Sequence, residues 1–433
     1  MRGLAKNACL AALILLTLVV MVRMATQSAL NAHPDEIYHV GAARYFIDYW
    51  DFPRIGDERT YQSYSNYGVS YLQQLDVVYF LAGKFAKAIR PLVPTDYLAL
   101  RYFNISLFAV LMALLFRLPD KKKLAFLPLF CSPQVWYVFS YFNGDAFPLF
   151  VSYLLVYLFA RREFPVDVPS FSLKHKNVRW LIQLALVLGV LLISKQNYYV
   201  LIAFFLSFLA LLAVQEGKIR LGAKNLVIMT LVAAALFGCR FAYHAYVNRE
   251  MPPDAVSKMA EQFAADDMKP SAQACGESFW GMRMREQGLT FPEMFTTWNW
   301  HIWTFRTSFG VYDYMKIYAP LIHYRYVKWA LLAFFLSVSL AIAQTGRKGL
   351  GVLALVLFFA GMTIFQAVYH SWINDFQAQG RYLFPIAGMG SLVMARSSEA
   401  LWRHRAAILF CALALYGLGM YSFIGVGLAG ITR

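Results

Sequence analysis

The stretch CLAALILLTLVVMVRMATQSALNAHPDEIYH, residues 9–39, joins a long apolar run to a short polar turn that is rich in acids and histidines. The apolar part is long enough to cross the hydrocarbon core of a bilayer as one helix. Arg2 and Lys6 precede it, and no convincing signal-peptidase site follows it. We therefore expect a retained signal anchor rather than a cleaved signal peptide. The polar turn begins where the chain first leaves the membrane.

Apolar runs of similar length recur along the whole 433-residue chain, which is 59% hydrophobic and 17% aromatic. Only 15% of its residues are charged, against roughly 25% in ordinary soluble domains. The expected spans are 8–30, 98–116, 124–142, 146–160, 180–194, 198–214, 225–247, 326–344, 350–369, 382–395 and 406–428. The sequence thus predicts an all-α polytopic membrane protein with about eleven transmembrane helices, some of them short enough to be tilted or broken. A β-barrel would show short alternating segments instead.

The formal net charge of +16 fits orientation in a membrane better than nucleic-acid binding, because no nucleic-acid-binding motif is present. Six connecting segments together hold 19 Lys and Arg against five Asp and Glu; they are 1–7, 117–123, 161–179, 215–224, 345–349 and 396–405. In the two long segments 31–97 and 248–325, acids balance or exceed bases. The positive-inside rule therefore predicts an N-in, C-out topology with two large outer loops.

We expect one integral membrane domain over residues 1–433, without a separate soluble domain. Four cysteines fall in apolar spans, and only Cys275 lies in an outer loop. This distribution argues against a framework of intramolecular disulfides.

Asp35 and Glu36 form an acidic pair at the first membrane exit, between His33 and His39. A carboxylate in this place can act as a general base that deprotonates an acceptor hydroxyl. If a divalent cation, Mg²⁺ or Mn²⁺, takes part, then Asp35, Glu36 and His39 are its expected ligands. The spacing of Glu36 and His39 would also suit zinc, but the HExxH pattern of metalloproteases is absent.

Further polar residues stand out in otherwise apolar surroundings on the expected outer side. They are Asp145 in SYFNGDAFPLF (140–150), Lys195 in LLISKQNYYVLIAF (191–204), Arg306 in TFRTSFG (304–310), and Arg381 with Tyr382 in INDFQAQGRYLFPI (373–386). Each has a plain structural interpretation, such as a tight turn, a snorkelling lysine or an interfacial arginine. Together with Asp35 they favour one chemistry, in which an acid activates an acceptor and cations bind a phosphate leaving group.

Five motifs, HPDEIYH, FNGDAF, SKQNYY, FGVYDY and QGRYLFPI, occur in this order between about residues 30 and 390. They resemble motifs of a family of bacterial membrane proteins of unassigned function, grouped near the GT-C superfamily of integral membrane glycosyltransferases. PDE-x-x-H and QGRY are the most specific of them. The resemblance implies a GT-C fold and a polyprenyl-phosphate-linked sugar donor.

The resemblance also places Asp35 at the position of the catalytic acid, with Glu36 adjacent. Lys195 and Arg381 match family positions, and their role in phosphate binding is our inference. We expect His39, Asp145, Lys195, Arg306, Arg381 and Tyr382 to bind substrate. Many GT-C enzymes carry an appended soluble outer domain, and we expect none in residues 1–433, which suggests a small or lipid-linked acceptor.

The sequence thus predicts an inverting glycosyltransferase of the bacterial inner membrane, with its active site on the periplasmic face. It would move a sugar from a polyprenyl-phosphate donor to a lipid- or glycan-linked acceptor in envelope polysaccharide or glycolipid assembly, with membrane lipids and no nucleic acid as partners. A polysaccharide polymerase or ligase with a diphosphate-linked donor stays open, because it would use outer-loop arginines without an acidic base. A lipid-linked sugar transporter or flippase also stays open, because Arg101 and Arg240 fall within spans.

Overall fold

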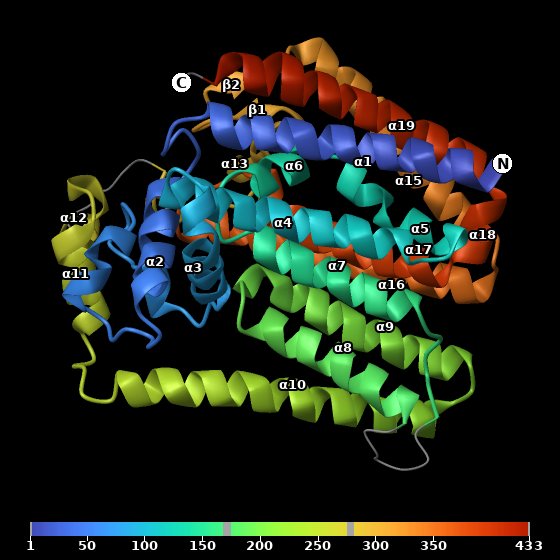
Figure 1. Cartoon of the computed structure of the whole chain (residues 1–433), viewed down its shortest axis with the longest axis horizontal. Coiled ribbons are helices and arrows are strands. Elements are labelled where there is room, and N and C mark those ends of the chain that lie inside the picture. The colour runs from blue at the N-terminus through green and yellow to red at the C-terminus, as the bar shows by residue number, and fades with distance from the viewer. Residues whose placement is uncertain (1, 168–174, 275–280, 432–433) are drawn as a thin grey trace.

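A computed structural model describes residues 2–167, 175–274 and 281–431 of the chain; Cys275 lies outside these ranges. The described residues are mostly helical (Figure 1). The two named strands, β1 (Val311–Tyr312) and β2 (Ile317–Tyr318), form a short antiparallel pair in which Val311 lies opposite Tyr318. The sequence-based prediction of an all-α membrane protein is therefore confirmed.

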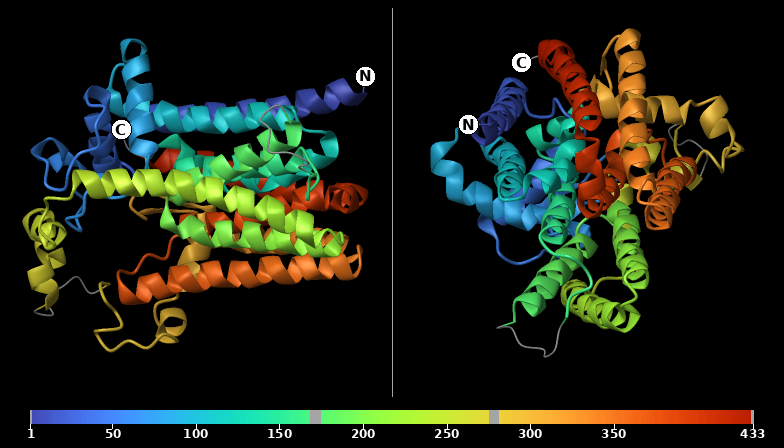
Figure 2. Two further views of the ribbon diagram at one scale, coloured as in Figure 1. Left: turned by 90° about the horizontal axis from the view of Figure 1, so that it is seen from below. Right: turned by 90° about the vertical axis from the view of Figure 1, so that its right-hand side faces the viewer.

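Seven helical segments of the described chain are long and apolar enough to cross a membrane. They lie in α1 (Arg2–Gln27), α4 (Asp96–Phe116), α9 (Tyr199–Gln215, with a preceding 3₁₀ turn, η5, Gln196–Tyr198), α10 (Ile219–Val247), α15 (Leu321–Ala343), α16 (Arg347–Ile373), and α19 (Arg405–Met420) with the π-helical segment η8 (Tyr421–Leu428). Each coincides with a predicted span. Figure 2 shows these long helices running side by side along one axis.

The other four predicted spans are helical but short or broken, so the count of eleven is not confirmed. Residues 124–142 form the 3₁₀ helix η4 (Leu124–Phe130) and the short helix α6 (Pro133–Ser140). Pro128 and Pro133 explain this break, because proline has no backbone N–H to continue a helix. The remaining three are α7 (Ala146–Ala160), α8 (Lys176–Leu192) and α17 (Phe384–Arg396), with 15, 17 and 13 residues.

The described parts of the connecting segments that were predicted to lie inside meet at one end of the bundle, together with α5 (Asp120–Lys123) and α18 (Ser398–Arg403), on the right in Figure 1. Contacts that join them are Lys123–Asn7, Lys121–Glu399, Arg396–Glu216, Lys348–Glu216 and the bond from the Val166 N–H to Asn225. The chain ends labelled N and C lie at opposite ends of the bundle. The grouping predicted from charge is therefore present in the structure.

The two long loops meet at the opposite end and fold into short helices. These are α2 (Glu36–Asp48), η1 (Glu58–Ser63), η2 (Tyr71–Gln73), α3 (Val78–Ile89), η3 (Arg90–Leu92), α11 (Ala255–Phe263), η6 (Asp266–Met268), α12 (Pro270–Ala274), α13 (Glu293–Thr296) and α14 (Trp300–Phe309). The loops are hydrogen-bonded to each other, for example from the Ile55 N–H to Asn248 and from the Ala265 N–H to the Asn66 carbonyl.

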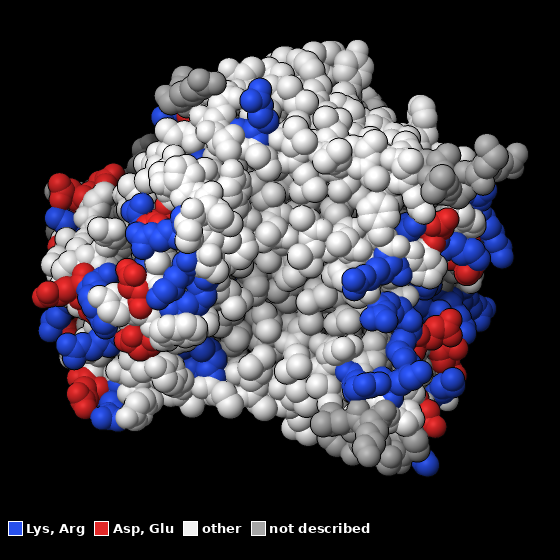
Figure 3. Space-filling model, in the orientation of Figure 1, with Lys and Arg blue, Asp and Glu red and all other residues white. Residues whose placement is uncertain are grey.

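Charged side chains gather at these two ends, and a broad, almost uncharged band separates them (Figure 3). Within this band, α10 and α16 expose large apolar side chains such as Leu231 and Leu357. Such a surface suits contact with lipid. In contrast, α4 buries Leu100, Phe108 and Leu111 at the centre of the bundle. The fold is thus a multi-pass helical bundle with a polar helical layer at one end.

Candidate functional site

Six of the eight predicted site residues line one cavity of about 690 Å³ at the outer-loop end of the bundle. They are Asp35, His39, Asp145, Lys195, Arg381 and Tyr382. These residues come from four distant parts of the chain, which the fold brings together. The other two predicted residues, Glu36 and Arg306, do not line this cavity.

Asp35 occupies the N-cap position of α2 but does not cap the helix with its side chain. Its φ of 60° lies in the left-handed region, which aspartate tolerates better than most residues. Such backbone conformations cluster at functional sites. The carboxylate is 35% exposed and lies 3.7 Å from Arg381 Nη2. Asp35 is therefore accessible from the cavity and close to a cation without being locked against it.

Arg381 owes its position to the glycine that precedes it in the QGRY motif. A Cβ at Gly380 would lie 2.0 Å from Ser308 Oγ, so only glycine allows η7 (Gly380–Leu383) to pack this closely on α14. The Gly380 N–H also donates to Thr307 Oγ1 at 2.8 Å. The close approach fixes the backbone of η7, and with it the buried Arg381 at the cavity wall.

The Arg381 guanidinium lies between two acids, 3.7 Å from Asp35 and 3.5 Å from Asp145. Its Nη1 donates to the Tyr141 hydroxyl at 3.3 Å. Burial lowers the pKa of Arg381, but neighbouring Tyr382, Tyr141 and the two acids more than offset this, so its pKa is raised and it stays a cation. Its Nε has no hydrogen-bond partner among the described residues, although it is buried. A buried guanidinium with a free donor is suited to receive an anionic ligand.

Asp145 lies in a turn that the neighbouring Asn143 shapes. The Asn143 Oδ1 accepts from the backbone N–H groups of Asp145 and Ala146, at 2.8 and 3.1 Å. This is an Asx-type turn, in which a short amide side chain bonds the backbone just after it. The same side chain donates to the Val138 and Tyr141 carbonyls. The turn holds the almost fully buried Asp145 toward the cavity.

The Asp145 carboxylate accepts a 2.5 Å hydrogen bond from Lys195 Nζ, and both groups line the cavity. Burial alone would raise the pKa of Asp145, but the charges of Lys195 and Arg381 more than offset it, so the pKa is lowered. Asp145 is thus an anion that holds two cations next to Asp35. Two acids and two cations form an electrically balanced cluster.

His39 is a buried residue that lines the cavity. Its Nδ1 lies 2.8 Å from the Tyr79 hydroxyl, and its ring stacks on Tyr71 with centroids 4.0 Å apart. Burial, and next the charge of Lys195, lower the pKa of His39 to about 3. Gly144 lets the turn at Asp145 approach, because a Cβ there would meet Tyr79 and His39 at 3.2 and 3.5 Å. His39 therefore shapes the cavity as an uncharged ring.

Tyr382 is hydrogen-bonded to a group of cavity-lining residues that sequence analysis did not identify, namely Tyr67, Asp375 and Gln377. The Tyr67 hydroxyl donates to Asp375 at 2.6 Å, Gln377 donates to Asp375, and the Tyr382 hydroxyl donates to Gln377. Residues 376–379 have no helical structure. Alternate residues of an extended segment point to the same side. The i, i+2 spacing of Asp375 and Gln377 before Arg381 was therefore the available signal.

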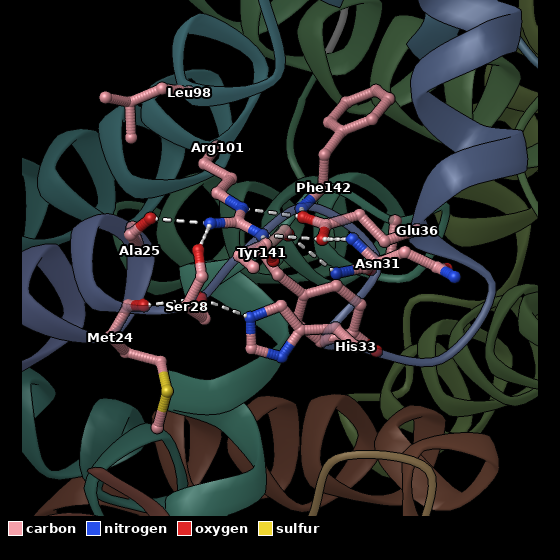
Figure 4. Close-up of polar contacts among 12 residues, drawn as sticks. Met24, Ala25, Ser28, Asn31, His33, Glu36, Leu98, Arg101, Tyr141 and Phe142 are labelled. Atoms are coloured by element: carbon pink, nitrogen blue, oxygen red, sulfur yellow. Dashed lines mark hydrogen bonds and ion pairs between the residues drawn. The ribbon is translucent and has the colours of Figure 1, made fainter. Parts of the chain in front are cut away.

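Glu36, the expected alternative to Asp35, is fully buried and paired with Arg101 at 2.6 Å. Figure 4 shows this pair enclosed by the turn at Ser28 and Asn31 and by Tyr141 and Phe142. Arg306 lies over the rings of Trp303 and Tyr324, 5.4 and 5.8 Å from their centroids. The structure thus gives both residues surroundings that are separate from the cavity.

The residues proposed as metal ligands do not form a metal site. Among the described residues, no group of three His, Cys, Asp or Glu side chains is arranged to hold a metal ion. Both Glu36 oxygens accept from Arg101, and His39 Nδ1 is engaged by Tyr79. The Asp145 carboxylate is engaged by cations. The donor set of Asp35, Glu36 and His39 therefore does not fit a shared divalent cation.

No protein-family model matches the sequence, and no curated protein matches it. Among solved structures, the chain is similar to ArnT from Cupriavidus metallidurans bound to undecaprenyl phosphate, with a TM-score of 0.52 and 12% identity. The match covers 98% of this chain and 77% of ArnT. The chain therefore shares the fold of ArnT over almost its whole length.

Two further matches have lower TM-scores. AglB from Archaeoglobus fulgidus, in complex with an inhibitory peptide and a dolichol-phosphate, matches with a TM-score of 0.47 and 11% identity over 96% of this chain and 56% of AglB. ArnT from Cupriavidus metallidurans in the apo state matches with a TM-score of 0.36 and 12% identity over 92% of this chain and 78% of ArnT. The first match, to ArnT bound to undecaprenyl phosphate, supports the fold expected from the sequence motifs.

Proposed function

We propose that the chain is a membrane glycosyltransferase that uses a polyprenyl-phosphate-linked sugar as donor. The observation that carries this proposal is the convergence of Asp35, Arg381 and Lys195 on one cavity at the outer-loop end of the bundle. The three come from separate outer segments and share no local structural reason to meet. The likeness of the fold to ArnT, which was solved with undecaprenyl phosphate, supports the lipid class of the donor.

In the proposed reaction, Asp35 accepts the proton of an acceptor hydroxyl as its oxygen attacks the anomeric carbon of the donor sugar. The bond between this carbon and the phosphate oxygen breaks, and its electron pair stays on the phosphate. One direct displacement inverts the anomeric configuration. The partial exposure of Asp35 suits this role, because the acceptor has to reach the carboxylate from the cavity.

The leaving polyprenyl phosphate gains negative charge in the transition state. Arg381 and Lys195 line the cavity, which Arg283 also lines, and Arg381 lies 3.7 Å from Asp35. Stabilisation of developing charge by fixed cations is a major source of catalysis. The free Nε of Arg381 provides a donor without breaking an existing hydrogen bond. Asp145 would hold both cations in place before the donor arrives.

The transporter alternative rested on Arg101 and Arg240, which fall within spans. Arg101 is paired with Glu36, which explains its presence without a transport path. Arg240 lies 4.1 Å from the centre of the Phe52 ring, and its Nη2 donates to the Gln74 carbonyl. Its Nε and Nη1 are buried without a hydrogen-bond partner among the described residues, so the support for a transporter now rests on Arg240 alone.

The test is a transfer assay with purified protein in detergent or liposomes. Sugar-linked polyprenyl phosphate and polyprenyl diphosphate are compared as donors, with lipid-linked and small glycan acceptors. Release of polyprenyl phosphate and formation of a product with inverted configuration support the proposal. Transfer from the diphosphate donor alone would instead favour a polymerase or ligase. Transbilayer movement of the lipid without sugar transfer would favour a flippase.

Envelope glycolipids compared by mass spectrometry between cells with and without the protein would name the transferred sugar and its acceptor. We propose that the reaction takes place on the periplasmic face of the bacterial inner membrane, in polysaccharide or glycolipid assembly. A reporter fused to the 248–325 loop would test the face. A cytoplasmic signal from this loop would overturn the N-in topology on which the periplasmic assignment rests.

A further inference from the structure

Glu36 and Arg101 form an ion pair that is closed to solvent at both side chains. Arg101 Nε donates to one carboxylate oxygen at 2.7 Å, and Nη2 donates to the other at 2.6 Å. This two-point contact sets the distance and the orientation of α2 relative to α4. The pair lies beside the cavity but outside its lining.

The remaining donors of Arg101 bind the chain where the first span ends. Its Nη1 donates to the carbonyls of Ala25 and Ser28, at 2.6 and 2.7 Å, and its Nη2 donates to Ala29 at 2.9 Å. The last carbonyls of a helix have no partners within the helix and carry partial negative charge. Arg101 therefore fixes the exit of α1 onto α4 (Figure 4).

Glu36 in turn binds two turns that carry acids of the site. Its Oε2 accepts from the Asn31 N–H at 3.2 Å, in the turn that leads to Asp35. Its Oε1 accepts from the Phe142 N–H at 3.3 Å, in the turn that leads to Asp145. One buried carboxylate thus joins the two backbone segments from which the site acids project.

His33 adds a second link between the turn that leads to Asp35 and the turn that leads to Asp145. Its ring stacks on Tyr141 with centroids 4.6 Å apart, and Ser28 bonds its Nε2 at 2.8 Å. The Tyr141 hydroxyl accepts from Arg381. The exit of α1, the turn at Asp145 and the guanidinium of the site are therefore connected through packed and hydrogen-bonded groups.

We propose that Glu36 and Arg101 are positioning residues that fix the separation of Asp35 and Asp145 around Arg381. This inference rests on the proposed function, since it assigns the pair a role in placing the proposed base. It explains why two acids are adjacent in the sequence: Asp35 lines the cavity, and Glu36 holds the turn that carries Asp35. It also assigns Arg101, which lies within the α4 span, a role in positioning the site residues.

A plain contribution to folding is the competing explanation. Buried ion pairs can often be replaced by apolar residues of similar volume without loss of stability, whereas removal of one partner leaves an unpaired buried charge. The double variant Glu36→Leu/Arg101→Met therefore separates the two roles. The matched control is Lys121→Met/Glu399→Leu, which removes an ion pair at the exposed, opposite end of the bundle.

Transfer is measured for both double variants at saturating and limiting donor, after gel filtration and thermal unfolding have shown a folded protein. We expect kcat of Glu36→Leu/Arg101→Met to fall by about 10²-fold, the size of effect that misplacement of a catalytic group by about 1 Å produces. The KM for the donor should change by less than about threefold, because Arg381 and Lys195 remain. The control should keep the wild-type kcat. A folded Glu36→Leu/Arg101→Met protein with wild-type kcat would overturn the proposal.

If the double variant does not fold, Glu36→Asp provides the second test. It keeps the charge but withdraws the carboxylate by one methylene group, so the turns at Asn31 and Phe142 are no longer held at the same distance. We expect a lower kcat with an unchanged donor KM, and wild-type kcat would again reject positioning. Asp35→Asn is run alongside. If Asp35→Asn is active, the role of Asp35 as general base in the proposed function fails; if it is inactive while Glu36→Asp is fully active, only the positioning role fails.

Discussion

Asp35 and Glu36 are adjacent in sequence, carry the same charge and each face an arginine, yet their surroundings differ. Glu36 is sealed from solvent and bound at both oxygens by Arg101. Asp35 is 35% exposed, and its distance of 3.7 Å from Arg381 is longer than a hydrogen bond. Glu36 is thus bound entirely within the protein, whereas Asp35 is accessible to a ligand.

The two arginines differ in the same way. Arg101 has all five N–H donors engaged, two by Glu36 and three by backbone carbonyls. Arg381 donates to Tyr141 at 3.3 Å, and its Nε is without a partner among the described residues. Unused hydrogen-bonding capacity, rather than charge or burial alone, distinguishes the group that can bind substrate from the group that holds the fold.

The largest expected effect is that of Asp35→Asn, which keeps the shape of the side chain but removes its basicity. Turnover should fall by about 10²- to 10⁴-fold, as expected for loss of a general base. Donor binding, measured separately by titration of the lipid, should persist. If Asp35→Asn were active and a folded Glu36→Gln were inactive with normal donor binding, the roles assigned to the two acids would be reversed.

Arg381→Ala should have the next largest effect, because it removes charged hydrogen bonds to the donor phosphate. We expect kcat/KM to fall by about 10- to 10²-fold. Arg381→Lys should cost about tenfold although charge is kept, because lysine lacks the planar fork that binds two phosphate oxygens. Titration of a lipid-phosphate donor against each purified variant measures the change.

Arg306→Ala is the matched control, because this arginine lies over Trp303 and Tyr324 and does not line the cavity. It should bind donor like the wild type. Weaker binding in Arg306→Ala together with normal binding in Arg381→Ala would move the phosphate site to the large outer loop, which the sequence had left open.

The sequence predicted the parts of the fold that depend on composition. Long apolar runs and the excess of Lys and Arg in short segments identified the seven long spans and grouped the segments at one end. The predicted count of eleven crossings is not confirmed, because prolines such as Pro128 break one apolar run into short helices. An apolar composition indicates that a segment is buried, either in lipid or in protein, but it does not show where a helix ends.

For the site, the structure brings six of the eight predicted residues to one cavity, and their roles stay predictions. Asp35 and Arg381 were identified because charges are rare in such a chain. Whether a charge is satisfied depends on residues that are distant in sequence, such as Arg101 for Glu36, which are 65 positions apart. Asp375 and Gln377 were overlooked because polar residues in an outer loop are common, and only their alternation marked them.

His39 should make stability depend on pH in a defined direction. Burial lowers its pKa from 6.5 to about 3 in the folded protein, so the unfolded chain binds more protons between these values. The free energy of unfolding should therefore rise with pH through this window, by about 1.4 kcal/mol per pH unit from this group. The stability is fully present above about pH 6.5 and is lost as the pH falls.

Thermal unfolding of the detergent-solubilised protein between pH 4.5 and 7.5 tests this expectation. His39→Gln should flatten the profile, and the exposed His301 provides the control substitution, His301→Gln. Some slope should remain, because burial lowers the pKa of His33 as well. An unchanged slope in His39→Gln would mean that folding does not lower the pKa of the ring, which would then be charged in the folded protein below about pH 6.5. It would then be a cation facing Asp145 and Lys195 rather than a neutral part of the wall.

The smallest expected effect is that of metal removal. In the cavity, Asp145 is neutralised by Lys195 and Arg381, and outside it Glu36 is occupied by Arg101. A divalent cation at Asp35 would lie near the positive Arg381 and would lack the several oxygen ligands that Mg²⁺ or Ca²⁺ prefers. We therefore expect EDTA to change turnover by less than about twofold, because charge stabilisation of the phosphate comes from side chains.

The assay compares chelated protein with protein resupplied with Mg²⁺ or Mn²⁺. Loss of activity on chelation that the metal restores would show that substrate phosphate completes a metal site with Asp35. In that case Asp35 would bind the metal ion, and Arg381 would orient the Asp35 carboxylate instead of binding the leaving group.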